Sequence, residues 1–151
     1  MPVYHVRFTC AADYNARLPH RPAHLAQLTG LRDDGRVVAG GPEPDGGAAH
    51  IFYRVADRAA LDRLIADNEF QRAGLFVAHE ARVFDEFLEP IERLPPDAGW
   101  KVTLVEGVPA DRARAREALA TLRAQKLVNL GGFFTDGTAL VVVRLDRKSV
   151  V

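Results

Sequence analysis

The sequence predicts an α+β fold, in which a βαββαβ unit with an antiparallel sheet is followed by a truncated βαββ repeat of that unit. Three observations support this prediction. Residues 3–9 alternate between apolar and polar side chains, which is the period of a half-buried strand. Residues 21–34 carry apolar side chains at helical spacing. A segment rich in Gly and Pro, residues 40–47, then separates two strand-like segments and predicts a hairpin.

The first unit has the clearer pattern of the two. Its expected elements are a strand at 3–9, a helix at 21–34, strands at 36–39 and 49–55, a helix at 57–66 and a strand at 75–84. Pro22 suits the first turn of its helix, because the N–H that proline lacks would have no partner there. Asp57 is a residue type that caps helix N-termini. These signals make both helix starts specific predictions.

A break in both periodicities predicts the boundary between the units. Residues 94–99 read Leu-Pro-Pro-Asp-Ala-Gly, which suits neither a helix nor a strand. We therefore expect a first domain over residues 1–90, a linker over 91–99 and a second domain over 100–151. Within the second domain we expect strands that include 101–105 and 139–143, with a helix at 111–125 between them.

The second domain is interpreted as a degraded copy of the first. Gly40-Gly41 and Asp45-Gly46 match Gly131-Gly132 and Asp136-Gly137 at one offset, since 131 − 40 and 136 − 45 both equal 91. At this offset Ala115 replaces the only histidine of the first helix, so we expect any chemistry in the first domain. The alternative is a chance match, because Gly-Gly and Asp-Gly are common in turns.

A βαββ half-domain on its own exposes one apolar sheet face to water. Each Å² of apolar surface that stays exposed loses roughly 25 cal/mol of stabilisation. We hypothesise that this half-domain packs on the open sheet face of the first domain, giving a monomeric pseudo-dimer. Assembly into a homo-oligomer is the alternative. Light scattering tests the hypothesis. A tight homodimer would contradict it, because a second copy of the chain, and not the half-domain, would then cover the open sheet face of the first domain.

The composition argues against several classes of function. Twenty Lys and Arg residues balance twenty Asp and Glu residues, which disfavours nucleic acid and acidic membranes as partners. Cys10 is the only cysteine and predicts no internal disulfide. No apolar run approaches the length of a membrane span, and no signal-peptide core is evident, so we expect a cytoplasmic protein. No nucleotide or dinucleotide fingerprint occurs, and we expect no cofactor.

Several short motifs resemble the YCII-related family of small bacterial domains. They are the block Arg21-Pro22-Ala23-His24-Leu25, Gly35 before a strand, Gly41-Pro42 after it, and Ala73-Gly74 before the last strand. The resemblance covers residues 1 to about 87. It implies a ferredoxin-like βαββαβ domain that usually dimerises into an α/β barrel, with an active site that contains a histidine and an aspartate.

The candidate catalytic residues are His24, Asp67 and Asn68. The family histidine corresponds to His24, and the helix dipole at the start of its helix favours a neutral ring that can relay a proton. Alignment on Ala73-Gly74 places Asn68 where the family usually has aspartate, with Asp67 one residue earlier. Asp67 could orient the ring electrostatically, whereas Asn68 could only hydrogen-bond to it. Both partners remain open at this point.

The candidate substrate-binding residues are Arg21, Arg17, Gly41 and Pro42. A guanidinium matches a carboxylate bidentately, so the two arginines suggest a small-molecule carboxylate ligand. Gly41 and Pro42 could bring a ligand close to the backbone, although a turn explains them equally well. The five histidines have no spacing typical of a metal site, and we expect none.

Two hypotheses of function follow. In the first, the chain is a small-molecule enzyme that uses His24 as a proton shuttle, of isomerase or lyase type, on a small oxygenated or aromatic acid; this rests on similarity to the family. In the second, the chain is a non-catalytic binding or assembly module in which His24 is structural. Asn68 in place of aspartate favours the second hypothesis.

Overall fold

The computed structural model describes residues 1–93 and 102–144 and divides into two compact units. Unit 1 is Met1–Val83 and unit 2 is Phe84–Val151. The division falls inside a strand, before the expected domain end at residue 90. The predicted linker segment at residues 94–99 lies outside the described residues. Within the described ranges, no helix combines the length and the hydropathy needed to cross a bilayer.

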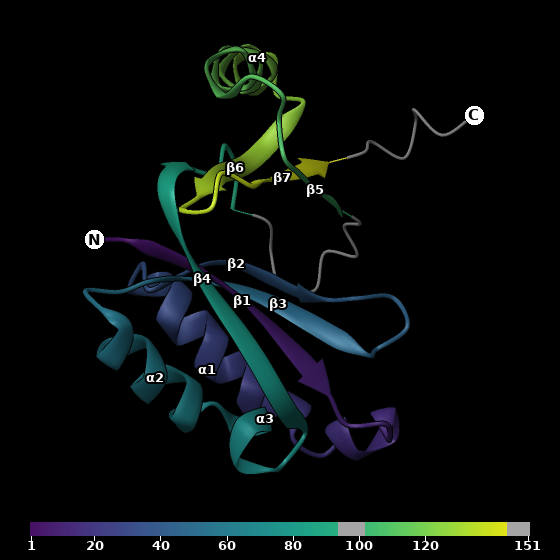
Figure 1. Cartoon of the computed structure of the whole chain (residues 1–151). Coiled ribbons are helices and arrows are strands. Elements are labelled where there is room, and N and C mark those ends of the chain that lie inside the picture. Colours follow the sequence, from purple (N-terminus) through teal and green to yellow (C-terminus); the bar gives the residue numbers. More distant parts are fainter. Residues whose placement is uncertain (94–101, 145–151) are drawn as a thin grey trace. The chain divides into compact units, whose positions relative to one another are not determined.

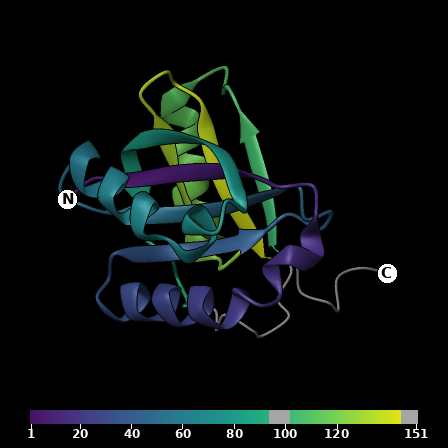
Figure 2. The same cartoon turned by 90° about the horizontal axis from the view of Figure 1, so that it is seen from below.

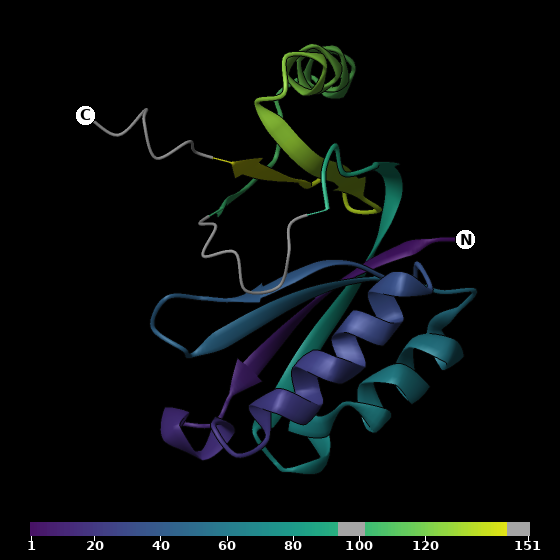
Figure 3. The same ribbon diagram turned by 180° about the vertical axis from the view of Figure 1, so that it is seen from behind.

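Unit 1 has the predicted βαββαβ order, with two short helices added. Its elements are β1 (Val3–Cys10), the 3-10 helix η1 (Tyr14–Arg17), α1 (Arg21–Asp33), β2 (Val37–Pro42), β3 (Ala48–Arg54), α2 (Arg58–Asp67), α3 (Glu69–Arg72) and β4 (Phe76–Leu88). The strands are antiparallel, in the order β2-β3-β1-β4. Helices α1 and α2 cover one face of this sheet (Figures 1 and 3) and run alongside its strands in the view from below (Figure 2).

The alternation along β1 divides the two faces of the sheet. Val6 and Phe8 are fully buried and join the core under the helices, to which α2 contributes Leu61 and Ile65. Arg7 lies between them in sequence and therefore points to the face that no helix of this unit covers. The apolar residues of β1 thus pack against the helices, and the polar residues between them lie on the opposite face of the sheet.

Side-chain caps define the segment between α2 and α3. Asp57 Oδ1 accepts a hydrogen bond from Ala60 N at 2.8 Å, as predicted for the start of α2. Asn68 Oδ1 accepts one from Phe70 N at 2.9 Å and starts α3. Gly74 then ends α3 at a φ of +72°, and Leu75 N donates to Phe70 O at 2.8 Å. Asn68 and Phe70 are held rigidly between these two turns.

The turn predicted at residues 40–47 is shorter in the structure, because β2 continues to Pro42. Gly40, Gly41 and Pro42 belong to β2, where Gly41 pairs with His50 and Pro42 with Ala49. β2 is an edge strand, and an edge is where a sheet tolerates a proline without losing a ladder hydrogen bond. The turn itself begins only after Pro42.

Unit 2 has the predicted βαββ order. Its elements are β5 (Val102–Gly107), α4 (Arg112–Ala124), β6 (Val128–Phe134) and β7 (Ala139–Arg144). The strands are antiparallel in the order β6-β7-β5, and the last residues of β4 pair with β6. Every residue of β6 is buried. The guanidinium of Arg112 on α4 lies 5.0 Å from the centroid of the Phe133 ring on β6, which holds the helix to the strand.

The two hairpins share a strand order, although their registers differ by one residue from the 91-residue offset, since Gly40 pairs with Ile51 and Gly131 with Val141. The strand order β2-β3-β1 of unit 1 matches β6-β7-β5 of unit 2. A Cβ added at Gly40 would lie 3.0 Å from His50 O, and one added at Gly131 would lie 3.1 Å from Leu140 O. These parallels support our proposal that the second unit arose as a copy of the first.

Candidate functional site

His24 lies in the first turn of α1 and is 8% exposed. Its ring stacks on Phe70 of α3, with centroids 3.8 Å apart and planes 7° from parallel. Phe76 of β4 meets the same ring edge-on at 6.1 Å. The α3 turn therefore provides an aromatic wall that fixes the imidazole against the core.

The imidazole of His24 is held in its neutral form. Burial is the main cause that lowers its pKa to about 4, and the charges of Arg21 and Arg17 act in the same direction. A side-chain hydrogen bond with Asn68 and, to a smaller extent, the charge of Glu69 oppose them. The sequence predicted a neutral ring from the helix dipole, but burial is the larger effect. Within the described part of the chain, His24 Nδ1 is buried and has no hydrogen-bond partner.

The structure brings Asn68, not Asp67, to His24. Asn68 is 1% exposed, caps α3 and hydrogen-bonds to the imidazole. The Asp67 side chain is 63% exposed, and its Oδ1 accepts a hydrogen bond from Arg72 Nη2 at 3.0 Å. Glu69, the next acidic residue, pairs with His20 at 2.9 Å. The group that directly supports the ring is therefore an amide without charge.

Sequence reasoning missed Tyr53 and Phe70 as members of this site. Tyr53 of β3 is fully buried, which raises the pKa of its hydroxyl, while the side chain of Asn68 acts in the opposite direction. Alternation along β3 puts Tyr53 on the same face as Ile51 and would have indicated an inward position. Phe70 follows Asn68 by two residues, so the Asn-Glu-Phe triplet was the available signal for it.

The charges of both candidate arginines lower the pKa of His24. Arg17 ends the 3-10 helix and is buried, with its Nη1 3.8 Å from Cys10 Sγ. Arg21 begins α1. Cys10 is buried, which raises the pKa of its thiol and makes it a poor nucleophile at neutral pH. The positive charges of Arg17 and Arg21 thus act on the neutral imidazole.

Gly41 and Pro42 lie elsewhere in unit 1. The groups around His24 come from η1, α1, α3 and β4, whereas Gly41 and Pro42 belong to β2 and pair with β3. A Cβ added at Gly41 would meet no atom within 4 Å, so this strand has open space on one side. The predicted substrate-binding residues thus fall into two separate groups. Among the described residues, no group of three or more His, Cys, Asp or Glu side chains is placed to hold a metal ion.

A comparison with protein-family models decides the family of this chain. The model of the YCII-related domain matches residues 1–85. The chain belongs to the YCII-related family. The family implies the βαββαβ unit that the structure shows. No curated protein sequence matches the chain.

Two solved structures resemble this family member. A "putative monooxygenase" from Lactobacillus acidophilus NCFM has a TM-score of 0.68 at 12% identity, covering 97% of this chain and 78% of its own. The 5-chloro-2-hydroxyhydroquinone dehydrochlorinase from Burkholderia phenoliruptrix AC1100, in complex with 2,5-dihydroxybenzoquinone, has a TM-score of 0.47 at 19% identity; the match covers 52% of this chain and 89% of that one. The first comparison shows a similar fold over both units.

Proposed function

We propose that this chain is a small-molecule enzyme of the YCII-related family, of isomerase or lyase type, that binds a small oxygenated or aromatic acid at His24. The observation that supports the proposal is the buried Nδ1 of His24, which has no partner within the described residues and lies in the field of Arg17 and Arg21. A buried polar atom without a hydrogen bond is costly, and a ligand hydroxyl would satisfy it.

The chemistry follows from the charges around the ring. A ligand hydroxyl donates to His24 Nδ1, and a ligand carboxylate pairs with a guanidinium. An imidazole with a pKa of about 4 is neutral at pH 7, so its unprotonated nitrogen can accept a hydrogen bond, and a proton transferred to it is quickly returned. The arginine charges stabilise the anion that remains on the ligand. Transfer of a proton away from the ligand and back suits an isomerisation that needs no cofactor.

Salicylate tests this proposal, because it carries both a hydroxyl and a carboxylate on one ring. We expect salicylate to shift the NMR signals of the His24 ring more strongly than benzoate, which lacks the hydroxyl. Arg21→Gln should weaken salicylate binding by about tenfold through loss of a charge-assisted pair. Equal responses to salicylate and benzoate, or no response to either, would overturn the proposal.

A second candidate function is a non-catalytic binding or assembly module in which His24 is structural. It is favoured by the close stacking of His24 on Phe70 and by the amide at position 68. In that case the ring packs the start of α1 and takes no part in proton transfer.

The two functions differ in what His24→Phe should do. We expect His24→Ala to lower the free energy of unfolding by roughly 2–3 kcal/mol, because it removes a buried ring, whereas His24→Phe should keep most of the packing. If His24 is only structural, His24→Phe retains salicylate binding as well. If His24 holds the ligand, the phenylalanine variant folds but does not bind salicylate.

Acid pH gives an independent readout of the same histidine. The pKa of His24 falls from 6.5 to about 4 on folding, so between these values the unfolded chain binds the extra proton. Stability is therefore fully present above 6.5 and is lost as the pH falls toward 4, by roughly 3 kcal/mol. Urea unfolding at about pH 7 and about pH 4.5 should show this loss in the natural chain and a smaller one in His24→Phe.

A further inference from the structure

The outermost strand of unit 2 is apolar and exposed. β5 lies at the edge of the order β6-β7-β5, and among the described residues it pairs with β7 alone (Figure 1). Val102 is 42% exposed and Val105 is 51% exposed, and these two residues point to opposite faces of the sheet. Leu104 between them is half-buried. Natural proteins usually protect such an edge, so an apolar edge strand that is exposed on both faces needs a physical explanation.

The matching strand of unit 1 shows what β5 lacks. In strand order β5 corresponds to β1, because β2-β3-β1 matches β6-β7-β5. β1 has an antiparallel neighbour on each side, β3 and β4. The βαββ order of unit 2 contains no counterpart of the second long helix and the last strand of unit 1. Within the described residues, β5 therefore has the neighbour that corresponds to β3 but not the one that corresponds to β4.

The edge strand of unit 1, β2, is protected against further pairing, and β5 is not. β2 contains Pro42, and its register against β3 shifts between Val37 and Ala39. Proline lacks an N–H and an irregular register bends the strand, so both features hinder the addition of another strand. β5 contains no proline, and its six residues pair with β7 in one unbroken register. Its outer row of backbone N–H and C=O groups is therefore a regular template for one more strand.

We propose that β5 pairs with β5 of a second copy of this chain, about a two-fold axis perpendicular to the sheet. This symmetry makes the two strands antiparallel, which is also the relation of β4 to β1 in unit 1. Both copies use the same edge, so the exposed β5 edges are consumed and the protected β2 edges remain. The assembly therefore stops at two chains. Edge pairing covers neither face of the sheet, and it does not depend on the function proposed for His24.

The charges of unit 2 are compatible with this pairing. A two-fold axis places one residue opposite its own copy, and the pairing is longest with Leu104 or Val105 at the centre. In these two registers Glu106, the only charged residue of β5, lies opposite Val102 or Leu104 of the other copy and not opposite the second glutamate. Like charges therefore do not meet across the pair.

The arginines of α4 lie over a different part of unit 2. The helix contacts β6, with the guanidinium of Arg112 over the Phe133 ring. Arg116 Nε donates to Glu86 Oε2 at 2.7 Å, at the end of β4. Both contacts direct these cations toward β4 and β6 and away from the β5 edge, which favours close approach of a second copy.

The size of the interface sets the strength of the dimer. Two six-residue strands bury less than the about 800 Å² per partner that a standard stable interface buries. The pairing is therefore a weak one, and we expect half of the chains to associate at a concentration of about 10–100 µM.

Sedimentation equilibrium from about 1 µM to about 1 mM tests the proposal, because mass action drives a weak dimer with concentration. The average mass should rise from one chain toward two. Val102→Lys and Val105→Lys should each weaken association by about tenfold or more, since each places an ammonium group in the pair. The matched control is Val108→Lys, because Val108 is 77% exposed and follows the last residue of β5. Its association should equal that of the natural chain.

Several outcomes would overturn the proposal. A single-chain mass at every concentration excludes the dimer, and the partner of β5 is then a different protein. Association that survives both lysine substitutions in β5 comes from another surface. Association that responds to only one of them comes from one face of the sheet and not from its edge. Unfolding curves of each variant identify any loss of fold.

Hydrogen exchange gives a second readout that only edge pairing predicts. Successive N–H groups of a strand point to alternate sides, so half of those in β5 face away from β7. These amides should exchange more slowly at about 1 mM than at about 1 µM, at every second residue of Val102–Gly107. A mass that doubles without this alternating protection contradicts the pairing.

Discussion

Replacing Asn68 with Asp should raise the pKa of His24 from about 4 by roughly two units. The present partner is an amide, which offers a hydrogen bond but no charge to imidazolium. A carboxylate at the same position would lie within hydrogen-bond reach of the ring, and an opposite charge at that range stabilises the charged form by about one to three pKa units. Titration of the His24 ring signals by NMR measures the effect directly.

The matched control for this experiment is Asp67→Asn. Asp67 is solvent-exposed and paired with Arg72, so its neutralisation should leave the titration of His24 unchanged. Asn68→Asp keeps the oxygen that accepts from Phe70 N, so α3 should still form. A His24 titration that responds to position 67 and not to position 68 would show that our assignment of the partner is wrong.

Most of the fold of unit 1 was predictable because its signals are local. The alternation over residues 3–9, the cap at Asp57 and Gly35 before a strand each concern neighbouring residues, and the elements occur where those signals place them. The turn over residues 40–47 was predicted too long because Gly40, Gly41 and Pro42 read as turn residues. Their place in β2 depends on pairing with β3 at a sheet edge, which composition does not encode.

The candidate site was predictable only in part, for a similar reason. Family motifs identified His24, and alignment offered both Asp67 and Asn68 as its partner. The choice between them depends on the short helix α3, because its cap turns Asn68 inward and leaves Asp67 exposed. The stacked ring of Phe70 follows from the same turn. A helix of four residues is too short to show a helical periodicity in the sequence.

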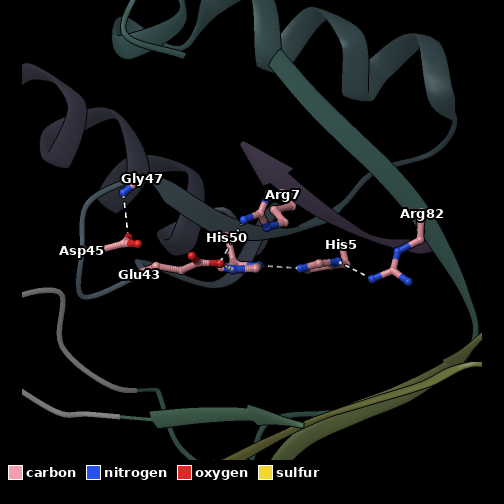
Figure 4. A network of polar contacts seen from close by, with 7 residues as sticks. All are labelled: His5, Arg7, Glu43, Asp45, Gly47, His50 and Arg82. Atoms are coloured by element: carbon pink, nitrogen blue, oxygen red, sulfur yellow. Dashed lines mark hydrogen bonds and ion pairs between the residues drawn. The ribbon is translucent and has the colours of Figure 1, made fainter. Parts of the chain in front are cut away.

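The contacts of His5 with His50 and with Arg82 (Figure 4) show the same limit more clearly. His5 and His50 are 45 positions apart in sequence, and His5 and Arg82 are 77 apart. Neither pair has a spacing that suggests metal binding or catalysis, so spacing gave no reason to join them. The alternation along β1 did place His5 and Arg7 on the polar face. The partners on β3 and β4 required the register of the sheet.

Gly132→Ala should destabilise unit 2 by about 3 kcal/mol or more. A Cβ at this position would overlap the ring of Phe84 and the backbone oxygen of Glu86, both at the end of β4. The backbone oxygen cannot rotate away, so the strands must separate or the ladder must shift, at a cost typical of severe overpacking. Urea unfolding followed by far-UV circular dichroism measures the loss.

Gly41→Ala is the matched control, and its comparison with Gly132→Ala tests how the two hairpins differ. Gly41 takes the equivalent place in the proposed repeat, yet a Cβ there would meet nothing within 4 Å. Its strand β2 is the outer strand of the sheet in unit 1, whereas β6 has β7 on one side and the end of β4 on the other. We expect Gly41→Ala to change stability by less than about 1 kcal/mol, with a gain if the lower entropy of the unfolded chain dominates.

Equal losses in both variants would mean that the cost arises from the strand backbone at these glycines and not from the pairing of β4 with β6. A large loss confined to Gly132→Ala would instead show that the second hairpin depends on β4, which explains why a βαββ unit without its own last strand can complete a sheet.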